Sequence, residues 1–119
     1  MFGHAAQIGV APASEYTFIV LVTPVGAYYK GGLAGVKCQV STKYDRAAPR
    51  GTGAAKCAGN YAASMLPQVE AIRNGFPVVL YLDAKTNSKV EEFSTSNFFG
   101  IRVVDGVPEY HTPESESIL

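Results

Sequence analysis

The spacing of hydrophobic positions changes along this chain, and the changes predict its secondary structure. Residues 16–22 are mostly apolar, β-branched or aromatic and show no alternation, as in a strand that is buried on both faces. Residues 36–41 alternate between apolar and polar side chains, which is typical of a strand with one face in solvent. Residues 1–14 are rich in Ala, Gly and Pro without a clear period, so we predict a connector there.

A helical period begins near residue 60. Apolar side chains recur on one face at helical spacing, at Tyr61, Met65, Leu66, Val69 and Ile72. Pro67 lies inside this run and should kink or divide the helix, because proline removes a backbone hydrogen bond. Gly75 is a natural C-terminal cap.

The second half of the chain predicts strands joined by short turns. Strands are expected at residues 78–82, 90–93, 97–104 and 107–111. Asp105-Gly106 is a hairpin signal, residues 86–88 indicate a turn, and residues 45–53 indicate a loop. Several strands around one main helix predict an α+β (mixed α/β) fold with antiparallel pairing near the end of the chain.

Composition limits the partners that we expect. The chain has 119 residues, which fits one domain, and only 17% of them are charged, against a typical quarter. This low fraction suggests apolar surface that meets another domain or subunit. Ten basic and ten acidic residues cancel, which argues against a nucleic-acid partner.

The chain carries no signal for export or membrane insertion. No run approaches the roughly 20 apolar residues that span a bilayer, and the N-terminal residues do not resemble a secretory signal. We therefore expect a cytoplasmic protein without a membrane partner. Cys38 and Cys57 are then expected to be free thiols, and no residue spacing indicates a metal site.

Lys56 is the strongest candidate for a chemically reactive side chain. It lies among small residues in the segment 51–61, and small neighbours would leave room for a flat cofactor ring beside its amine. Taken alone, Lys56 is weak evidence, because most lysines are solvated surface residues, and Gly51, Gly53 and Gly59 could equally be ordinary loop glycines.

The surrounding residues resemble the branched-chain members of the fold-type IV pyridoxal phosphate-dependent aminotransferases. The lysine region of that family reads G-T-G-A-A-K-x-G-G-N-Y-A-A-S, and residues 51–64 match it apart from Ala58, where the family usually has glycine. Leu82-Asp83 and residues 91–99 match two later segments, L-D and E-E-x-x-x-x-N-x-F. Segments upstream of Lys56 are similar to branched-chain members, at residues 24–32 and 44–49.

The resemblance extends from about residue 12 to residue 119 and implies a domain division. Residues 1–14 would be the remnant of an interdomain connector. Residues 15–119 would be the N-terminal portion of the large domain that binds pyridoxal 5′-phosphate. The fold expected for this portion is several strands packed around one main helix.

The resemblance implies roles for three residues that would act on the cofactor. Lys56 would form a Schiff base with the cofactor aldehyde and then act as general base and acid, with burial favouring its neutral amine. Glu92 would face the pyridine nitrogen and keep it protonated. Tyr61 would hydrogen-bond the ring oxygen. The structural alternatives are a solvated Glu91–Glu92 pair and a tyrosine that anchors the start of a helix.

Three further residues match positions around the cofactor and substrate. Arg46 and Thr95 would lie near the cofactor, and Tyr28 would line the substrate pocket. Alternatively, Arg46 binds loop carbonyls, Thr95 shapes a turn, and Tyr28 packs in a core or an interface. We interpret Asp83 as structural and Cys57 as a small packing residue.

The resemblance implies transamination of leucine, isoleucine or valine with 2-oxoglutarate in a homodimer or another self-associated form. Enzymes of this family are considerably longer, and their phosphate site and substrate carboxylate site use segments that this sequence lacks. We therefore expect a truncated form with little activity alone. The alternatives are a non-catalytic packing module or another fold-type IV enzyme, such as a D-amino acid aminotransferase.

Overall fold

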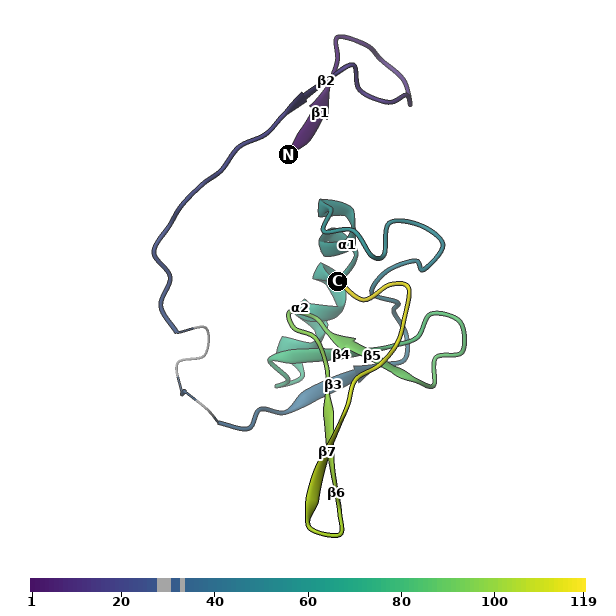
Figure 1. Cartoon of the computed structure of the whole chain (residues 1–119). Helices are drawn as coiled ribbons and strands as arrows, with labels where there is room; N and C mark the ends of the chain where they lie inside the picture. The colour runs from purple at the N-terminus through teal and green to yellow at the C-terminus, as the bar shows by residue number, and fades with distance from the viewer. Residues whose placement is uncertain (28–30, 33) are drawn as a thin grey trace. The chain divides into compact units, whose positions relative to one another are not determined.

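The computed structural model describes residues 1–27, 31–32 and 34–119. It divides the chain into two compact units, residues 1–34 and 35–119, and Figure 1 traces both from purple at the N-terminus to yellow at the C-terminus. The functional domain boundary that we expect after residue 14 stays a prediction.

The first unit contains one antiparallel pair, β1 (Phe2–His4) and β2 (Glu15–Thr17). The His4 ring and the Thr17 hydroxyl lie 2.9 Å apart and join the two strands. The buried strand predicted at 16–22 is wrong, because only its first two residues lie in β2 and Leu21 is 86% exposed. A strand buried on both faces needs a layer on each side, whereas β1 and most of β2 are themselves exposed.

A three-stranded sheet forms the centre of the second unit. β3 (Cys38–Ser41) runs parallel to β4 (Val78–Leu82), and β4 pairs antiparallel with β5 (Val90–Phe93). Figure 1 shows β4 between the other two strands. The central strand is almost fully buried along residues 78–81. These three strands confirm the sequence prediction.

The predicted helix is divided at Ser64 into α1 (Ala58–Ala63) and α2 (Met65–Arg73). Pro67 explains the division, because its missing N–H cannot bond the carbonyl of Ala63, and the prediction of a kink or break is confirmed. Ala71 packs against Val79 and Tyr81 of β4 in the core. The helices and sheets together confirm the α+β class.

The apolar face of the two helices is exposed rather than packed on this core. Its members are between 44% and 65% exposed, at Tyr61, Met65, Leu66, Val69 and Ile72. Small or compact residues, Pro67 and Ala71, are the buried positions of α2 instead. Gly75 ends the helical region with φ of 84°, as expected of a C-terminal cap.

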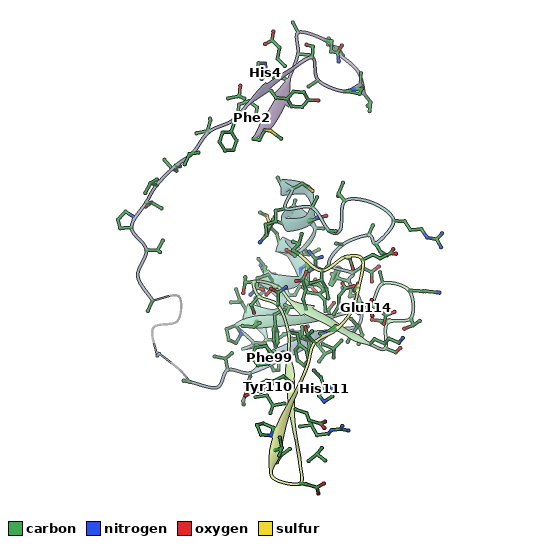
Figure 2. The ribbon with its side chains drawn as sticks, in the orientation of Figure 1. Phe2, His4, Phe99, Tyr110, His111 and Glu114 are labelled. Atoms are coloured by element: carbon green, nitrogen blue, oxygen red, sulfur yellow. The ribbon has the colours of Figure 1, made fainter. Side chains whose placement is uncertain are left out.

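A hairpin of β6 (Gly100–Val104) and β7 (Val107–His111) follows the sheet. Asp105 and Gly106 connect the strands with positive φ values of 51° and 80°, which confirms the predicted tight turn. The ring of Phe99, just before β6, and the ring of Tyr110 in β7 are labelled in Figure 2 and have centroids 6.1 Å apart. In the described part of the chain, no helix is long and apolar enough to cross a membrane.

Asp83 organises the turn after β4. Its carboxylate accepts hydrogen bonds from the hydroxyl and backbone N–H of Thr86 and from the backbone N–H groups of Ser88 and Lys89. The Thr86 hydroxyl and these N–H groups hold the pKa of Asp83 well below its usual range. The turn predicted at residues 86–88 and the structural interpretation of Asp83 are both confirmed.

Replacing Tyr81 with phenylalanine should stabilise the second unit. The Tyr81 side chain is fully buried, and its hydroxyl has no hydrogen-bond partner among the described residues. Removing an unpaired buried hydroxyl should raise the free energy of unfolding by about 1 kcal/mol, measured by urea titration. The control is Tyr110→Phe, whose ring is 68% exposed and whose effect should be near zero.

Tyr81→Phe should also change how the free energy of unfolding depends on pH in the alkaline range. Burial raises the pKa of Tyr81 to about 12, whereas an unfolded tyrosine ionises near pH 10. The folded state therefore keeps a proton that the unfolded state loses, and stability falls as pH rises through this window. Tyr81→Phe should remove that fall, and an unchanged slope would contradict the assignment.

Candidate functional site

Residues that the sequence analysis selected come together around one hollow of about 110 Å³. Five of them line it, at Arg46, Lys56, Tyr61, Glu92 and Thr95. They come from the loop after β3, the loop before α1, α1 itself, β5 and the turn after β5. The sixth selected residue, Tyr28, lies outside the described residues.

The hollow has a polar rim. Its remaining lining residues come from α1, from the junction of α1 with α2, from the end of β5 and the segment after it, and from residue 119, at Asn60, Ser64, Phe93, Ser94, Ser96, Asn97 and Leu119. The Asn97 side chain donates a hydrogen bond of 3.3 Å to Glu92 and another of 2.9 Å to the Leu119 carbonyl. Asn97 therefore connects the acidic side of the hollow to residue 119.

A buried ion pair forms the floor of this site. The Arg46 Nε and Glu92 Oε1 atoms lie 2.5 Å apart, and each side chain is only 5% exposed. These two atoms have no further hydrogen-bond partner among the described residues, so at this contact each charge is compensated by the other. Arg46 Nη2 also donates hydrogen bonds to the carbonyls of Gly53, at 3.2 Å, and Ser117. Arg46 thus contacts Glu92 and loop carbonyls together.

Glu91 and Glu92 do not form the solvated acidic pair that we considered, because both are buried, at 3% and 4% exposure. The pairing of β4 with β5 shifts register between Leu80 and Leu82, and two glutamates stand opposite Tyr81. Such a bulge places two side chains where a regular strand has one, and bulges often adjust side chains beside functional sites. No local sequence signal indicated this bulge.

The two largest influences on the Glu92 carboxyl oppose each other. Its burial raises the pKa of Glu92, and the positive charge of Arg46 lowers that pKa in opposition. Burial is the larger influence, so the pKa of Glu92 lies above its ordinary value. The ion pair therefore counteracts a burial that would otherwise favour the neutral acid.

Lys56 is exposed in the loop before α1. The expectation that it is buried is wrong for the described structure, because its neighbours from Gly53 to Gly59 have side chains too short to cover it. An exposed amine at the edge of the hollow is accessible to an incoming aldehyde.

Asn60 fixes this loop, and the sequence analysis gave it no role. Its buried side chain donates hydrogen bonds of 2.6 Å to the Thr52 carbonyl and 2.7 Å to the Ala55 carbonyl. The asparagine in the lysine motif quoted above could have indicated that Asn60 has a role in this loop. The neighbouring thiol belongs to the same loop: a hydrogen bond with the Thr52 side chain lowers the pKa of Cys57.

Gly53 is required for a close approach between two segments. A Cβ at this position would lie 2.7 Å from the Ala48 carbonyl oxygen and 2.9 Å from the Ser117 Cβ. A Cβ at Gly59, by contrast, would meet nothing within 4 Å. Gly53 is therefore more than an ordinary loop glycine.

Tyr61, from the lysine motif, and Thr95, from the later glutamate motif, both line the hollow. Tyr61 is 46% exposed, so it does not anchor α1 in the core of this unit. Thr95 lies in a turn in which the backbone N–H of Phe93 donates a hydrogen bond of 3.0 Å to the Ser96 carbonyl. Thr95 therefore belongs both to this turn and to the lining of the hollow. Cys38 and Cys57 are free thiols, as expected.

Breaking the Arg46–Glu92 pair should be costly. Arg46→Met should lower the free energy of unfolding by about 3–5 kcal/mol, because it leaves a buried carboxylate without its counter-charge. Arg46→Met combined with Glu92→Leu should recover most of this loss. Urea titration at neutral pH measures both effects.

The matched control is Arg102→Met, since Arg102 pairs with Glu109 at 2.7 Å while its side chain is 67% exposed. An exposed pair contributes less than about 1 kcal/mol. Equal losses for the two arginine variants would contradict the view that burial makes the Arg46 pair special.

No protein-family model matches the chain, but individual proteins do. It is 48% identical over 120 residues to the branched-chain-amino-acid aminotransferase of Helicobacter pylori and 48% over 124 residues to that of Haemophilus influenzae. Identity to the Mycobacterium tuberculosis protein of the same name is 46% over 119 residues. These matches cover 100% of this chain and 32–35% of each relative. The chain therefore belongs to the same family as the branched-chain-amino-acid aminotransferases, and it corresponds to about one third of their length.

Proposed function

We propose that this chain carries part of the site of a pyridoxal phosphate-dependent enzyme that transfers amino groups between leucine, isoleucine or valine and 2-oxoglutarate. The observation that carries the proposal is that Lys56 and Glu92 line the same hollow. The names of the relatives support amino-group transfer and the branched-chain substrate class.

The chemistry of the lining residues fits pyridoxal 5′-phosphate. A primary amine at Lys56 suits the cofactor aldehyde, and the Glu92 carboxyl, a buried acidic group that lines the same hollow, suits a protonated ring nitrogen. Hydroxyl groups at Tyr61 and Thr95 can donate hydrogen bonds to ring or phosphate oxygens. When bound, the cofactor supplies an aldehyde that takes up the amino group and a ring that withdraws electrons.

Each residue then has a distinct task. Lys56 would hold the cofactor through its amine and would accept and return the proton that moves during amino-group transfer. Glu92 would hold the ring nitrogen with its carboxylate, and Arg46 favours the ionised carboxylate by lowering the pKa of Glu92 against the effect of burial. Tyr61 would orient the ring by donating a hydrogen bond to its oxygen.

The described residues form one wall of a site rather than a full enclosure. The hollow measures about 110 Å³, whereas ligand pockets usually occupy about 300–1,000 Å³. We therefore propose that this chain binds the cofactor weakly and transfers amino groups slowly on its own. We also propose a cytoplasmic location, which the two free thiols support.

Borohydride trapping should locate the reactive amine. After incubation with pyridoxal 5′-phosphate and reduction, peptide mass spectrometry should find the main adduct on Lys56, because its exposed amine borders the hollow that Tyr61 and Glu92 also line. Lys56→Ala should abolish this adduct. The control, Lys85→Ala, removes an exposed lysine that is not among the residues lining the hollow and should leave the adduct in place. Equal labelling of all lysines would contradict the proposed function.

A second candidate function is packing against another copy of the chain, and the exposed apolar face of α1 and α2 supports it. Leu66 and Ile72 are 56% and 58% exposed, and exposed apolar patches often mark contact surfaces. We propose self-association through this face, consistent with a homodimer or a related assembly.

Charge introduced on this face should weaken self-association. Leu66→Lys with Ile72→Lys should shift the sedimentation coefficient toward that of a monomer, because lysine cannot be buried cheaply without a partner. The control, Val107→Lys, adds a charge on the hairpin at a residue that is 64% exposed. A monomeric wild-type chain, or equal dissociation by the control, would contradict this role.

A further inference from the structure

Glu91 is a buried carboxylate that the proposed chemistry does not use. Only 3% of the residue is exposed, and it lies beside Glu92 in the bulge of β5. Its Oε1 atom accepts hydrogen bonds from the hydroxyls of Ser115, at 2.6 Å, and Ser117. Two hydroxyl donors on one buried carboxylate oxygen fasten the C-terminal segment to the strand that carries Glu92.

The contacts continue from this anchor to the candidate site. Ser117 is fully buried, and its carbonyl accepts a hydrogen bond from Arg46 Nη2. The Nε atom of the same guanidinium faces Glu92 at 2.5 Å. Glu91, Ser117, Arg46 and Glu92 thus form an unbroken series of polar contacts.

We propose that Glu91 is a positioning residue: it anchors Ser115 and Ser117 so that the Ser117 carbonyl holds the Arg46 guanidinium beside Glu92. Hydrogen bonds to an ionised carboxylate are stronger than neutral ones, which suits an anchor that must hold a backbone carbonyl in place. Ser117 is thus held by its hydrogen bond to Glu91 and also by its close approach to Gly53. The anchor itself needs no cofactor, and only its importance for transamination rests on the proposed function.

Selective proteolysis tests the anchor. Glu114 and Glu116 are exposed and flank Ser115, and Figure 2 labels Glu114 in the C-terminal segment. Glu91→Gln, and separately Ser115→Ala with Ser117→Ala, should speed cleavage there by a glutamate-specific protease about tenfold, as expected for the loss of charge-assisted hydrogen bonds. Combining all three changes should add little, because they remove the same interaction.

The matched control for proteolysis is Thr112→Ala. Thr112 belongs to the same segment, but its hydroxyl donates to the Phe98 carbonyl at 3.0 Å rather than to Glu91. Cleavage should change little in this variant. Wild-type cleavage rates in Glu91→Gln and in the serine variant, or additive effects of the two sets of changes, would overturn the anchor.

Titration of Glu92 tests the positioning of Arg46, which a merely structural anchor would not affect. The groups that influence the Glu92 carboxyl are Arg46, Glu91 and the backbone at Leu119, together with the Asn97 side chain. Ser115→Ala with Ser117→Ala keeps the Glu91 side chain and removes only its hydroxyl donors. Release of Arg46 should then raise the pKa of Glu92 by about one unit or more.

This titration is followed by carbon-13 NMR of the Glu92 carboxyl in the full chain without cofactor. Thr112→Ala should leave the midpoint unchanged. If the double serine variant does not fold, Ser115→Ala alone gives the same test with smaller shifts, since Ser115 is only partly buried. An unchanged Glu92 midpoint beside faster cleavage would overturn the positioning role. Because no cofactor is present, these results are independent of whether Lys56 reacts with pyridoxal 5′-phosphate.

Discussion

The ion pair between Arg46 and Glu92 is the interaction on which the second unit and its candidate site depend. Two charges held 2.5 Å apart with 5% exposure cost desolvation energy, which only close geometry and further polar contacts can offset. The carbonyls of Gly53 and Ser117 accept from Arg46, and Asn97 donates to Glu92. One guanidinium thereby joins the loop after β3, the bulge of β5 and the C-terminal segment.

This arrangement places Glu92 and Lys56, the two residues that the proposed chemistry needs, in different environments. Glu92 is fixed in a buried network, whereas Lys56 is an exposed amine on a loop that Asn60 holds by two hydrogen bonds to backbone carbonyls. A fixed acid can hold charge at one place on a ring. An accessible amine can bond, release and carry a proton. The residues that the family resemblance selected, Lys56 and Glu92 among them, line one hollow in the folded chain.

Local signals in the sequence predicted most elements of the second unit. The apolar run at 78–82, the Asp105-Gly106 turn and the break before Pro67 depend on neighbouring residues, and each is confirmed. The spacing of the lysine and glutamate motifs also selected residues that share one hollow. Their roles in binding and catalysis stay predictions.

Features that depend on distant parts of the chain could not be derived from the sequence. Burial of residues 16–22 requires covering layers, and the first unit exposes this run. The bulge that buries Glu91 beside Glu92 comes from pairing with β4, and the anchor on Ser115 and Ser117 joins residues more than twenty positions apart. Neither has a local pattern. The exposure of Lys56 likewise depends on which side chains of the folded chain cover it, and this is not visible in the local sequence.

The central claim is that Glu92 faces the ring of a cofactor held at Lys56. Its most direct test is nitrogen-15 NMR of the reduced Lys56 adduct prepared with cofactor labelled at the ring nitrogen. The account predicts that the ring nitrogen stays protonated to higher pH in the wild-type chain than in Glu92→Gln, because a nearby carboxylate stabilises the charged form. Identical titration of the ring nitrogen in the two proteins would contradict the account.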